Sequence, residues 1–143
     1  MAAGTQVDLS AAGRSPVPAD SWSALIGGHV RLFLRADALA TFIAGVAGYG
    51  ALGGPWLALV PLVLVPDVAM VGYLRNARLG SITYNIGHNL ATAGAALGLG
   101  LWLGIGSLAI AGTVLVAHIG MDRLLGYGLK YPDAFKDTHL QRV

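Results

Sequence analysis

The sequence contains no cysteine and no glutamate, and it has few charged residues of any kind. Without cysteine, the chain can form no disulfide, thiolate metal site, iron–sulfur cluster or cysteine nucleophile. Without glutamate, side-chain carboxylate chemistry depends on seven aspartates. Charged residues make up only 11% of the 143 residues, whereas soluble domains carry about 25%. This deficit, together with 55% hydrophobic residues and a mean hydropathy of +0.66, indicates a membrane protein.

Four apolar stretches account for most of the chain, approximately residues 32–52, 56–74, 81–103 and 105–125. Each is near the roughly 20 residues that a helix needs to cross the hydrocarbon core of a bilayer. The connections are short, and alternating strand patterns are absent. The sequence therefore predicts an all-α fold, an integral membrane four-helix bundle formed by one domain over residues 29–126. Residues 1–28 are predicted to be a disordered N-terminal tail, and residues 127–143 a C-terminal segment outside the membrane.

The positive charges predict the orientation of these helices. All nine lysines and arginines lie before or at the start of the first stretch, between the second and third, or at and beyond the end of the fourth. By the positive-inside rule, both termini are then cytoplasmic. The same charges are too few and too scattered to predict nucleic-acid binding.

Small residues recur every four positions in the first and third apolar stretches. Such rows let helix backbones approach closely in lipid. They predict close packing within the bundle, and they could also form the contact of a homo-oligomer. The rows are Ala40, Ala44 and Gly48; Gly94 and Gly98; and Gly100 and Gly104.

Five aspartates and histidines lie inside the apolar stretches, where inserting a charge costs at least about 2.5 kcal/mol. At a rise of about 1.5 Å per residue, all five lie roughly 5–11 Å from the cytoplasmic ends of their predicted helices. His118 and Asp122 also share a helix face, because they are four residues apart. Every apolar stretch thus contributes at least one of these residues at a similar depth in the membrane. We therefore predict a functional site formed by Asp37, Asp67, His88, His118 and Asp122.

Two imidazoles and several carboxylates at one level suit a divalent metal ion such as Zn, Fe or Mn. Two alternatives remain open, namely a structural network of ion pairs and hydrogen bonds, and a metal-free acid/base site or proton relay. The predicted metal ligands are Asp67, His88, His118 and Asp122, and the predicted catalytic carboxylates are Asp37, Asp67 and Asp122.

Neighbouring residues are expected to shape this site. Tyr84 and Asn85 lie on the same helical face as His88, and they could orient its ring by hydrogen bonding. Pro66 directly precedes Asp67. Because proline lacks an N–H, we expect it to free the carbonyl of Leu62 and to kink the helix beside the carboxylate.

The segment after the fourth stretch, GYGLKYPDAFKDTHL, is basic and aromatic. It could be a lid over the site, with lysine and arginine side chains that bind an anionic headgroup. It could equally be an anchor at the membrane interface. The residues predicted to bind substrate are Tyr84, Asn85, Arg123, Tyr127 and Lys130.

Four strings of this sequence resemble a family of small bacterial four-span integral membrane proteins that is catalogued only as a domain of unknown function. The resemblance covers roughly residue 31 to the C-terminus. It implies a four-helix, multi-pass protein of the bacterial inner (cytoplasmic) membrane, and it points to the same Asp, His and Tyr positions. It implies no reaction. The strings are PDVAMVGYL (66–74), YNIGHN (84–89), AHIGMDRLLGYGLKYP (117–132) and FKDTHL (135–140).

The first functional hypothesis is a membrane-embedded, metal-dependent, hydrolase-like enzyme that acts on a lipid or isoprenoid-like substrate from the cytoplasmic side. Membrane lipid and a lipid-like small molecule are then the expected partners. One alternative is a metal-free acid/base isomerase or cyclase of an isoprenoid. Others are a proton- or ion-coupled transporter module and a membrane protein that holds haem between His88 and His118. The scarcity of polar residues in the outer halves of the stretches disfavours a transporter, and the acidic neighbours of the histidines disfavour haem.

Overall fold

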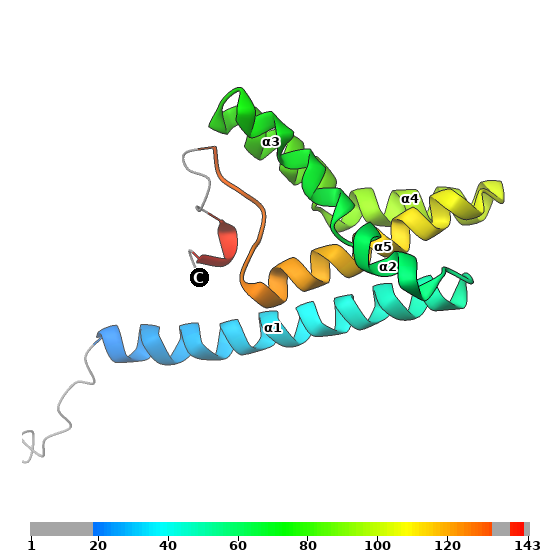
Figure 1. Ribbon diagram of the computed structural model, residues 1–143. Coiled ribbons are helices and arrows are strands. Elements are labelled where there is room, and N and C mark those ends of the chain that lie inside the picture. The colour runs from blue at the N-terminus through cyan, green and yellow to red at the C-terminus, as the bar shows by residue number, and fades with distance from the viewer. Residues whose placement is uncertain (1–18, 133–137, 142–143) are drawn as a thin grey trace, which may run out of the picture.

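The computed structural model describes residues 19–132 and 138–141, and within them the chain is all-helical (Figure 1). These residues form no strand, and their only extended pairing is an isolated bridge between Lys130 and Thr138. The predicted all-α fold is confirmed. The elements are α1 (Ala19–Ala51), α2 (Trp56–Leu62), η2 (Val65–Leu74, a 3-10 helix), α3 (Ala77–Gly87), α4 (Leu90–Leu103), α5 (Gly106–Leu125) and η3 (His139–Gln141, 3-10).

Helix α1 is 33 residues long and begins at Ala19. It therefore includes the last ten residues of the tail predicted over residues 1–28, whereas residues 1–18 lie outside the described part of the chain. The helix can extend this far because no proline occurs between Pro18 and Pro55 to interrupt its backbone hydrogen bonds.

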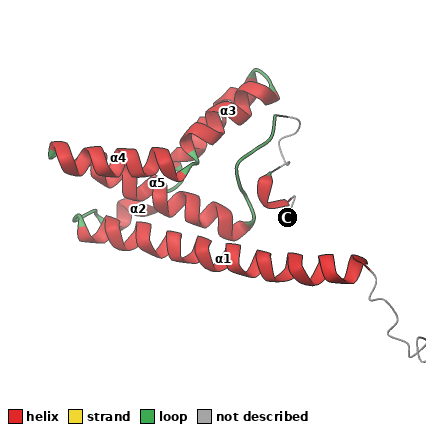
Figure 2. Cartoon of the chain, turned by 180° about the vertical axis from the view of Figure 1, so that it is seen from behind, coloured by secondary structure: helices red, strands yellow, loops and turns green. Residues whose placement is uncertain are grey.

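Helices α1, α4 and α5 pack side by side, with α5 in contact with both of the others (Figures 1 and 2). Glycines allow α1 and α5 to meet backbone to backbone. A Cβ atom on Gly45 would lie 2.3 Å from the backbone nitrogen of Ala117, and one on Gly120 would lie 2.3 Å from that of Phe42. No larger residue fits at either position without moving one helix away from the other.

The small-residue rows predicted from the sequence lie only partly at these contacts. A Cβ on Gly100 would meet the backbone nitrogen of Ala109 at 2.3 Å, and one on Gly48 would meet Thr113 at 3.0 Å. In contrast, Gly94 and Gly98 have no atom within 4 Å of such a Cβ among the described residues. Four-residue spacing marks one face of a helix, but it does not say which face a neighbouring helix covers.

The apolar stretches 56–74 and 81–103 are each divided, whereas the sequence predicts one continuous helix for each. In the first, α2 ends at Leu62 and the chain continues as the 3-10 helix η2. In the second, α3 ends at Gly87 and α4 begins at Leu90. The cause of the second division is Asn89, whose side chain accepts a hydrogen bond from the backbone N–H of Thr92 at 2.9 Å and so caps a new helix.

Because of these divisions, η2 and α3 form an antiparallel hairpin that projects at an angle from α1, α4 and α5 (Figures 1 and 2). The turn between them is stabilised by Asn76, whose side chain accepts a hydrogen bond from the backbone N–H of Leu79 at 2.8 Å. The chain after α5 then runs back towards this hairpin.

Within residues 19–132 and 138–141, two segments are long and apolar enough to cross a membrane. They are Trp56–Leu74, with 19 residues and a mean hydropathy of 2.1, and Gly106–Leu125, with 20 residues and a mean hydropathy of 1.5. Several large apolar side chains of the described residues are also exposed, among them Leu57 at 93%, Leu74 at 88% and Trp102 at 80%. Exposed apolar surface of this extent usually marks contact with a membrane or with another protein.

Candidate functional site

Two aspartates and two histidines from three helical elements converge at the base of the hairpin. Asp67 comes from η2, His88 follows the end of α3, and His118 and Asp122 are one turn apart on α5. One nitrogen or oxygen atom from each side chain lies within 4.8 Å of the corresponding atoms of the other three. Both histidines are buried, with 4% exposure for His88 and 0% for His118. The four residues therefore form one His–Asp cluster that could hold a metal ion.

The ring of His118 is oriented by a backbone carbonyl that Pro66 leaves free. The Val63 oxygen would pair with the N–H of residue 66 in a 3-10 helix, or of residue 67 in an α-helix. Residue 66 is a proline, which has no N–H, and the N–H of Asp67 donates to Leu64 at 3.2 Å. The Nδ1 atom of His118 lies within hydrogen-bond distance of the Val63 oxygen.

His88 is held by the helix that it terminates. Its Nδ1 lies 2.9 Å from the carbonyl oxygen of Tyr84, one turn earlier in the chain. The ring of His88 also stacks on that of Tyr84, with 3.7 Å between the ring centroids and 14° between the planes. The hydroxyl of Tyr84 donates a 2.6 Å hydrogen bond to Oδ2 of Asp122. One tyrosine thus positions two members of the cluster through three different groups.

The two imidazoles face each other, with 2.9 Å between their Nε2 atoms. Each Nδ1 lies beside a carbonyl oxygen, so the hydrogen-bond partners assign the ring hydrogen to Nδ1 in both residues. Each Nε2 of a neutral ring then presents a lone pair to the other. Two lone pairs at this separation repel each other unless a proton or another cation lies between them.

Four of the separations within the cluster are at or just above those of a tetrahedral zinc site. The carboxylate oxygens of Asp67 and Asp122 lie 3.6–3.9 Å from the two Nε2 atoms. Ligand atoms bound to zinc at 2.0–2.2 Å in a tetrahedron lie about 3.3–3.6 Å from one another. The 2.9 Å separation between the imidazoles of His88 and His118 is shorter, and the four ligand atoms together lie within 4.8 Å of one another.

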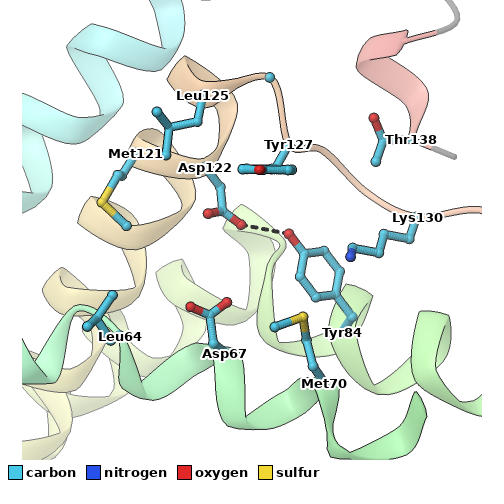
Figure 3. Close-up of a pocket in the computed structure, with 11 residues that line it drawn as sticks. Leu64, Asp67, Met70, Tyr84, Met121, Asp122, Leu125, Tyr127, Lys130 and Thr138 are labelled. Carbon is cyan, nitrogen blue, oxygen red and sulfur yellow. Dashed lines mark hydrogen bonds between the residues drawn. The ribbon is translucent and has the colours of Figure 1, made fainter. Parts of the chain in front are cut away.

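A pocket of about 660 Å³ lies beside the cluster. Asp67 and Asp122 are in its wall, and their side chains are 38% and 13% exposed, respectively. Figure 3 shows these carboxylates between an apolar and a polar side of the pocket. The apolar side includes Leu64, Met121 and Leu125, and the polar side includes Lys130 and Thr138.

The segment after α5 forms the polar side of this pocket because Asn85 holds it against α3. The side-chain amide of Asn85 donates to the carbonyl of Lys130 at 2.9 Å, and its oxygen accepts from the N–H of Lys130 at 2.7 Å. The bridge between Lys130 and Thr138 and the hydrogen bond from the His139 N–H to the Leu129 carbonyl, at 3.0 Å, continue this local pairing.

The structure brings together all four predicted metal ligands and places three of the five predicted substrate-binding residues, Tyr84, Tyr127 and Lys130, in the pocket wall. Asp37 is outside the cluster and exposed on α1. Arg123 lines a separate void of about 10 Å³.

Hydrogen bonding around the cluster differs from the expected pattern in two ways. His88 is oriented by the backbone carbonyl and stacked ring of Tyr84, whereas the Asn85 side chain pairs with Lys130. The carbonyl that supports the site is that of Val63 and not that of Leu62, because the segment at Pro66 is a 3-10 helix. Pro66 was the signal for such a carbonyl, but the sequence gives no sign that Thr138 reaches the pocket.

Fold and site together define a class of protein: an all-helical chain with two segments of membrane-spanning length and a buried His–Asp cluster next to a two-sided pocket. Residues 31–143 match the model of the family described as Domain of unknown function (DUF4260). The match covers most of the chain, so the chain belongs to this family. This confirms the resemblance to a domain of unknown function. The comparison with curated proteins found no match, and neither did the comparison with solved structures.

Proposed function

We propose that this chain is a membrane-embedded, metal-dependent enzyme that hydrolyses a lipid-like or isoprenoid-like substrate from the cytoplasmic side. The observation that carries the proposal is the meeting of four potential ligand atoms, two of which belong to carboxylates in the wall of a pocket with one apolar side. Ligand sites of enzymes commonly combine an apolar lining with a few convergent polar groups.

A membrane location is supported by the two long apolar segments and by the exposed side chains of α2 and η2. The distribution of the nine positive residues supports a multi-pass chain with both termini in the cytoplasm, and we place it in the bacterial inner membrane. Ionisable residues in membrane segments usually face a protein interior or a cavity and carry function. The buried cluster beside the pocket fits that expectation.

A metal ion accounts better for the cluster than an ion-pair network or haem does. A divalent cation would satisfy both inward-facing Nε2 atoms and both carboxylates together. An ion-pair network would have to leave the two lone pairs opposed or share a single proton between them. Haem would need room for a macrocycle between His88 and His118, but their Nε2 atoms are 2.9 Å apart and two carboxylates flank them.

The chemistry that such an ion would supply is the polarisation of an ester oxygen and the lowering of the pKa of water. Asp67 is the cluster member most exposed to the pocket, and no hydrogen bond fixes its carboxylate among the described residues. We assign Oδ2 of Asp67 the role of general base, while Oδ1, which lies 3.6 Å and 3.7 Å from the Nε2 atoms of His88 and His118, remains the ligand atom. The water oxygen forms the new bond to the ester centre, Asp67 accepts a water proton, the ester bond breaks, and the leaving alkoxide takes that proton.

Metal content of the full-length protein in detergent tests the first half of this proposal. Wild-type protein should contain about one ion per chain, and His118→Gln and Asp67→Asn should lose most of it. His29→Gln and Asp37→Asn are the matched controls, because both residues are exposed and lie outside the cluster. Circular dichroism checks that each variant remains helical. Well-folded wild-type protein that binds no supplied Zn, Fe or Mn would overturn the metal site.

The reaction is tested by incubating metal-loaded protein with an extract of bacterial membrane lipids, followed by mass spectrometry. Hydrolysis splits a consumed lipid into two products whose masses sum to that of the lipid plus one water, and Asp67→Asn should abolish their formation. Conversion without a change in mass would instead support the metal-free isomerase. A proton shared between His88 and His118, with the Tyr84–Asp122 hydrogen bond of 2.6 Å beside it, favours that enzyme as the second candidate.

A further inference from the structure

Two buried polar groups line the side of the pocket opposite Leu64, Met121 and Leu125, where Met70 also lies beside Tyr84 (Figure 3). Lys130 is 7% exposed, and its ammonium lies 4.5 Å from the centre of the Tyr84 ring and 5.4 Å from that of Tyr73. Thr138 is 1% exposed, and its hydroxyl has no hydrogen-bond partner among the described residues. A buried hydroxyl without a partner is uncommon in proteins. Both residues line the pocket that Asp67 and Asp122 also line.

The order of groups across the pocket matches the order of parts in an amphiphile. Figure 3 shows Leu64, Met121 and Leu125 on one side, the two carboxylates in the middle, and Lys130 with Thr138 on the other side. A ligand that follows this order has an apolar chain, then a bond beside the His–Asp cluster, and then a head that meets an ammonium and a hydroxyl.

The charge of the pocket decides which head is favoured. The pocket wall carries the two negative carboxylates of Asp67 and Asp122 and the single positive ammonium of Lys130. Its charge alone therefore favours binding of a cationic head. A divalent ion in the cluster reverses that balance and favours an anion. Burial lowers the pKa of Lys130 below its ordinary value, but the nearby carboxylates of Asp122 and Asp67 oppose this shift and favour the charged ammonium.

We propose that Lys130 and Thr138 form a subsite for the phosphate head of a single-chain lipid, whose chain lies against Leu64, Met121 and Leu125. A phosphate offers three terminal oxygens, which suits an ammonium, a hydroxyl and a metal ion at once, whereas a carboxylate offers only two. This inference rests on the proposed metal-dependent function and specifies the substrate class of that enzyme.

Binding of octyl phosphate to the zinc-loaded, full-length protein in a neutral detergent tests this subsite, with phosphorus NMR as the readout. Lys130→Met should weaken binding by about tenfold or more, because a charge-assisted contact is lost. Thr138→Val, which keeps the shape of the side chain, should weaken it by about threefold. Arg31→Met is the matched control, because Arg31 is an exposed cation outside the pocket wall. Zinc content is measured on every sample.

Inorganic phosphate and octyl trimethylammonium distinguish the possible ligands. Inorganic phosphate should bind at least about tenfold more weakly than octyl phosphate, because it buries no apolar chain. Equal binding of the two would overturn the lipid part of the inference, and preferred binding of the ammonium compound would overturn the anionic head. If zinc is retained but Lys130→Met binds octyl phosphate as wild type does, the subsite is wrong while the metal centre stands. If wild-type protein takes up no zinc, the proposed function itself fails.

Discussion

Helices α1, α4 and α5 pack along unbroken backbones, whereas the hairpin of η2 and α3 is bounded by two interruptions of the helical chain. In the packed region, glycines remove side chains so that backbones can touch, as at Gly45 and Gly120. At the hairpin, interruptions release or redirect backbone groups that then orient side chains, as the Val63 carbonyl orients His118.

The difference shows how one short chain can combine a rigid support with a polar site. The backbone N–H and C=O groups inside a regular helix pair with each other, so a carbonyl that lacks a backbone partner arises where the helix is interrupted or ends. Pro66 supplies such a group at Val63, and at the end of α3 the ring of His88 shares the Tyr84 carbonyl with the backbone N–H of His88. The cluster lies where the two regions meet, with His118 and Asp122 on α5 and with Asp67 and His88 from the hairpin and its end.

The largest effect is expected from filling the contact between α1 and α5. In Gly45→Ala the new Cβ would lie 2.3 Å from the backbone nitrogen of Ala117, which should lower the free energy of unfolding by about 2–3 kcal/mol. Gly98→Ala is the matched control, since no atom lies within 4 Å of its Cβ, and the higher helix propensity of alanine should make it neutral or stabilising by up to about 1 kcal/mol. Thermal unfolding in detergent measures both, and equal stabilities would contradict the packing described.

A smaller effect, confined to the cluster, is expected from Pro66→Ala. Alanine restores an N–H at residue 66, which can compete with His118 for the Val63 carbonyl. Metal affinity should fall by about 10–100-fold, as is common when the partner that orients a ligand is disturbed. Pro61→Ala, inside α2, should leave the affinity unchanged. Competition with a chelator measures it, and equal affinities of the two variants would show that His118 does not depend on this break.

The smallest effect is expected from Tyr84→Phe. The ring that stacks on His88 at 3.7 Å is kept, but the 2.6 Å hydrogen bond to Asp122 is lost. Metal affinity should fall by about threefold to tenfold, with little change in stability. Tyr127→Phe serves as the control, because Tyr127 is half exposed and lies outside the cluster. A change of the same size in both variants would mean that the hydroxyl of Tyr84 does not position the carboxylate.

Much of the cluster could be predicted from the sequence, because ionisable side chains are energetically unfavourable in an apolar environment and therefore stand out in an apolar stretch. The spacing of His118 and Asp122 places them on one helix face. Asp67 and His88 lie at a similar distance from the cytoplasmic ends of their predicted helices, which predicts that they belong to the same site. Asp37 satisfies the same depth criterion, yet it is exposed on α1. Depth along a helix does not fix the direction of a single side chain around its axis.

The interruptions were harder to predict than the ligands. Asn89 and Thr92 have the spacing of a helix cap, but they lie within a long apolar stretch whose hydropathy favours one continuous span. Pro66 indicates a break in the helix, but it does not specify whether the residues around it form an α-helix or a 3-10 helix. That distinction decides whether proline frees the carbonyl of Leu62 or that of Val63, and the proline alone does not determine it.

Helix α5 carries the contact with α1 and the two ligands within the same two turns. Ala117 and Gly120 touch the backbone of α1, while His118 and Asp122 belong to the cluster. A slip of α5 by one turn along α1 would displace both ligands together by about 5.4 Å. The register of α5 on α1 and the binding of an ion to the cluster are therefore thermodynamically linked. An ion bound by His118 and Asp122 on one side of α5 also stabilises the native register of the contact with α1 on the opposite side.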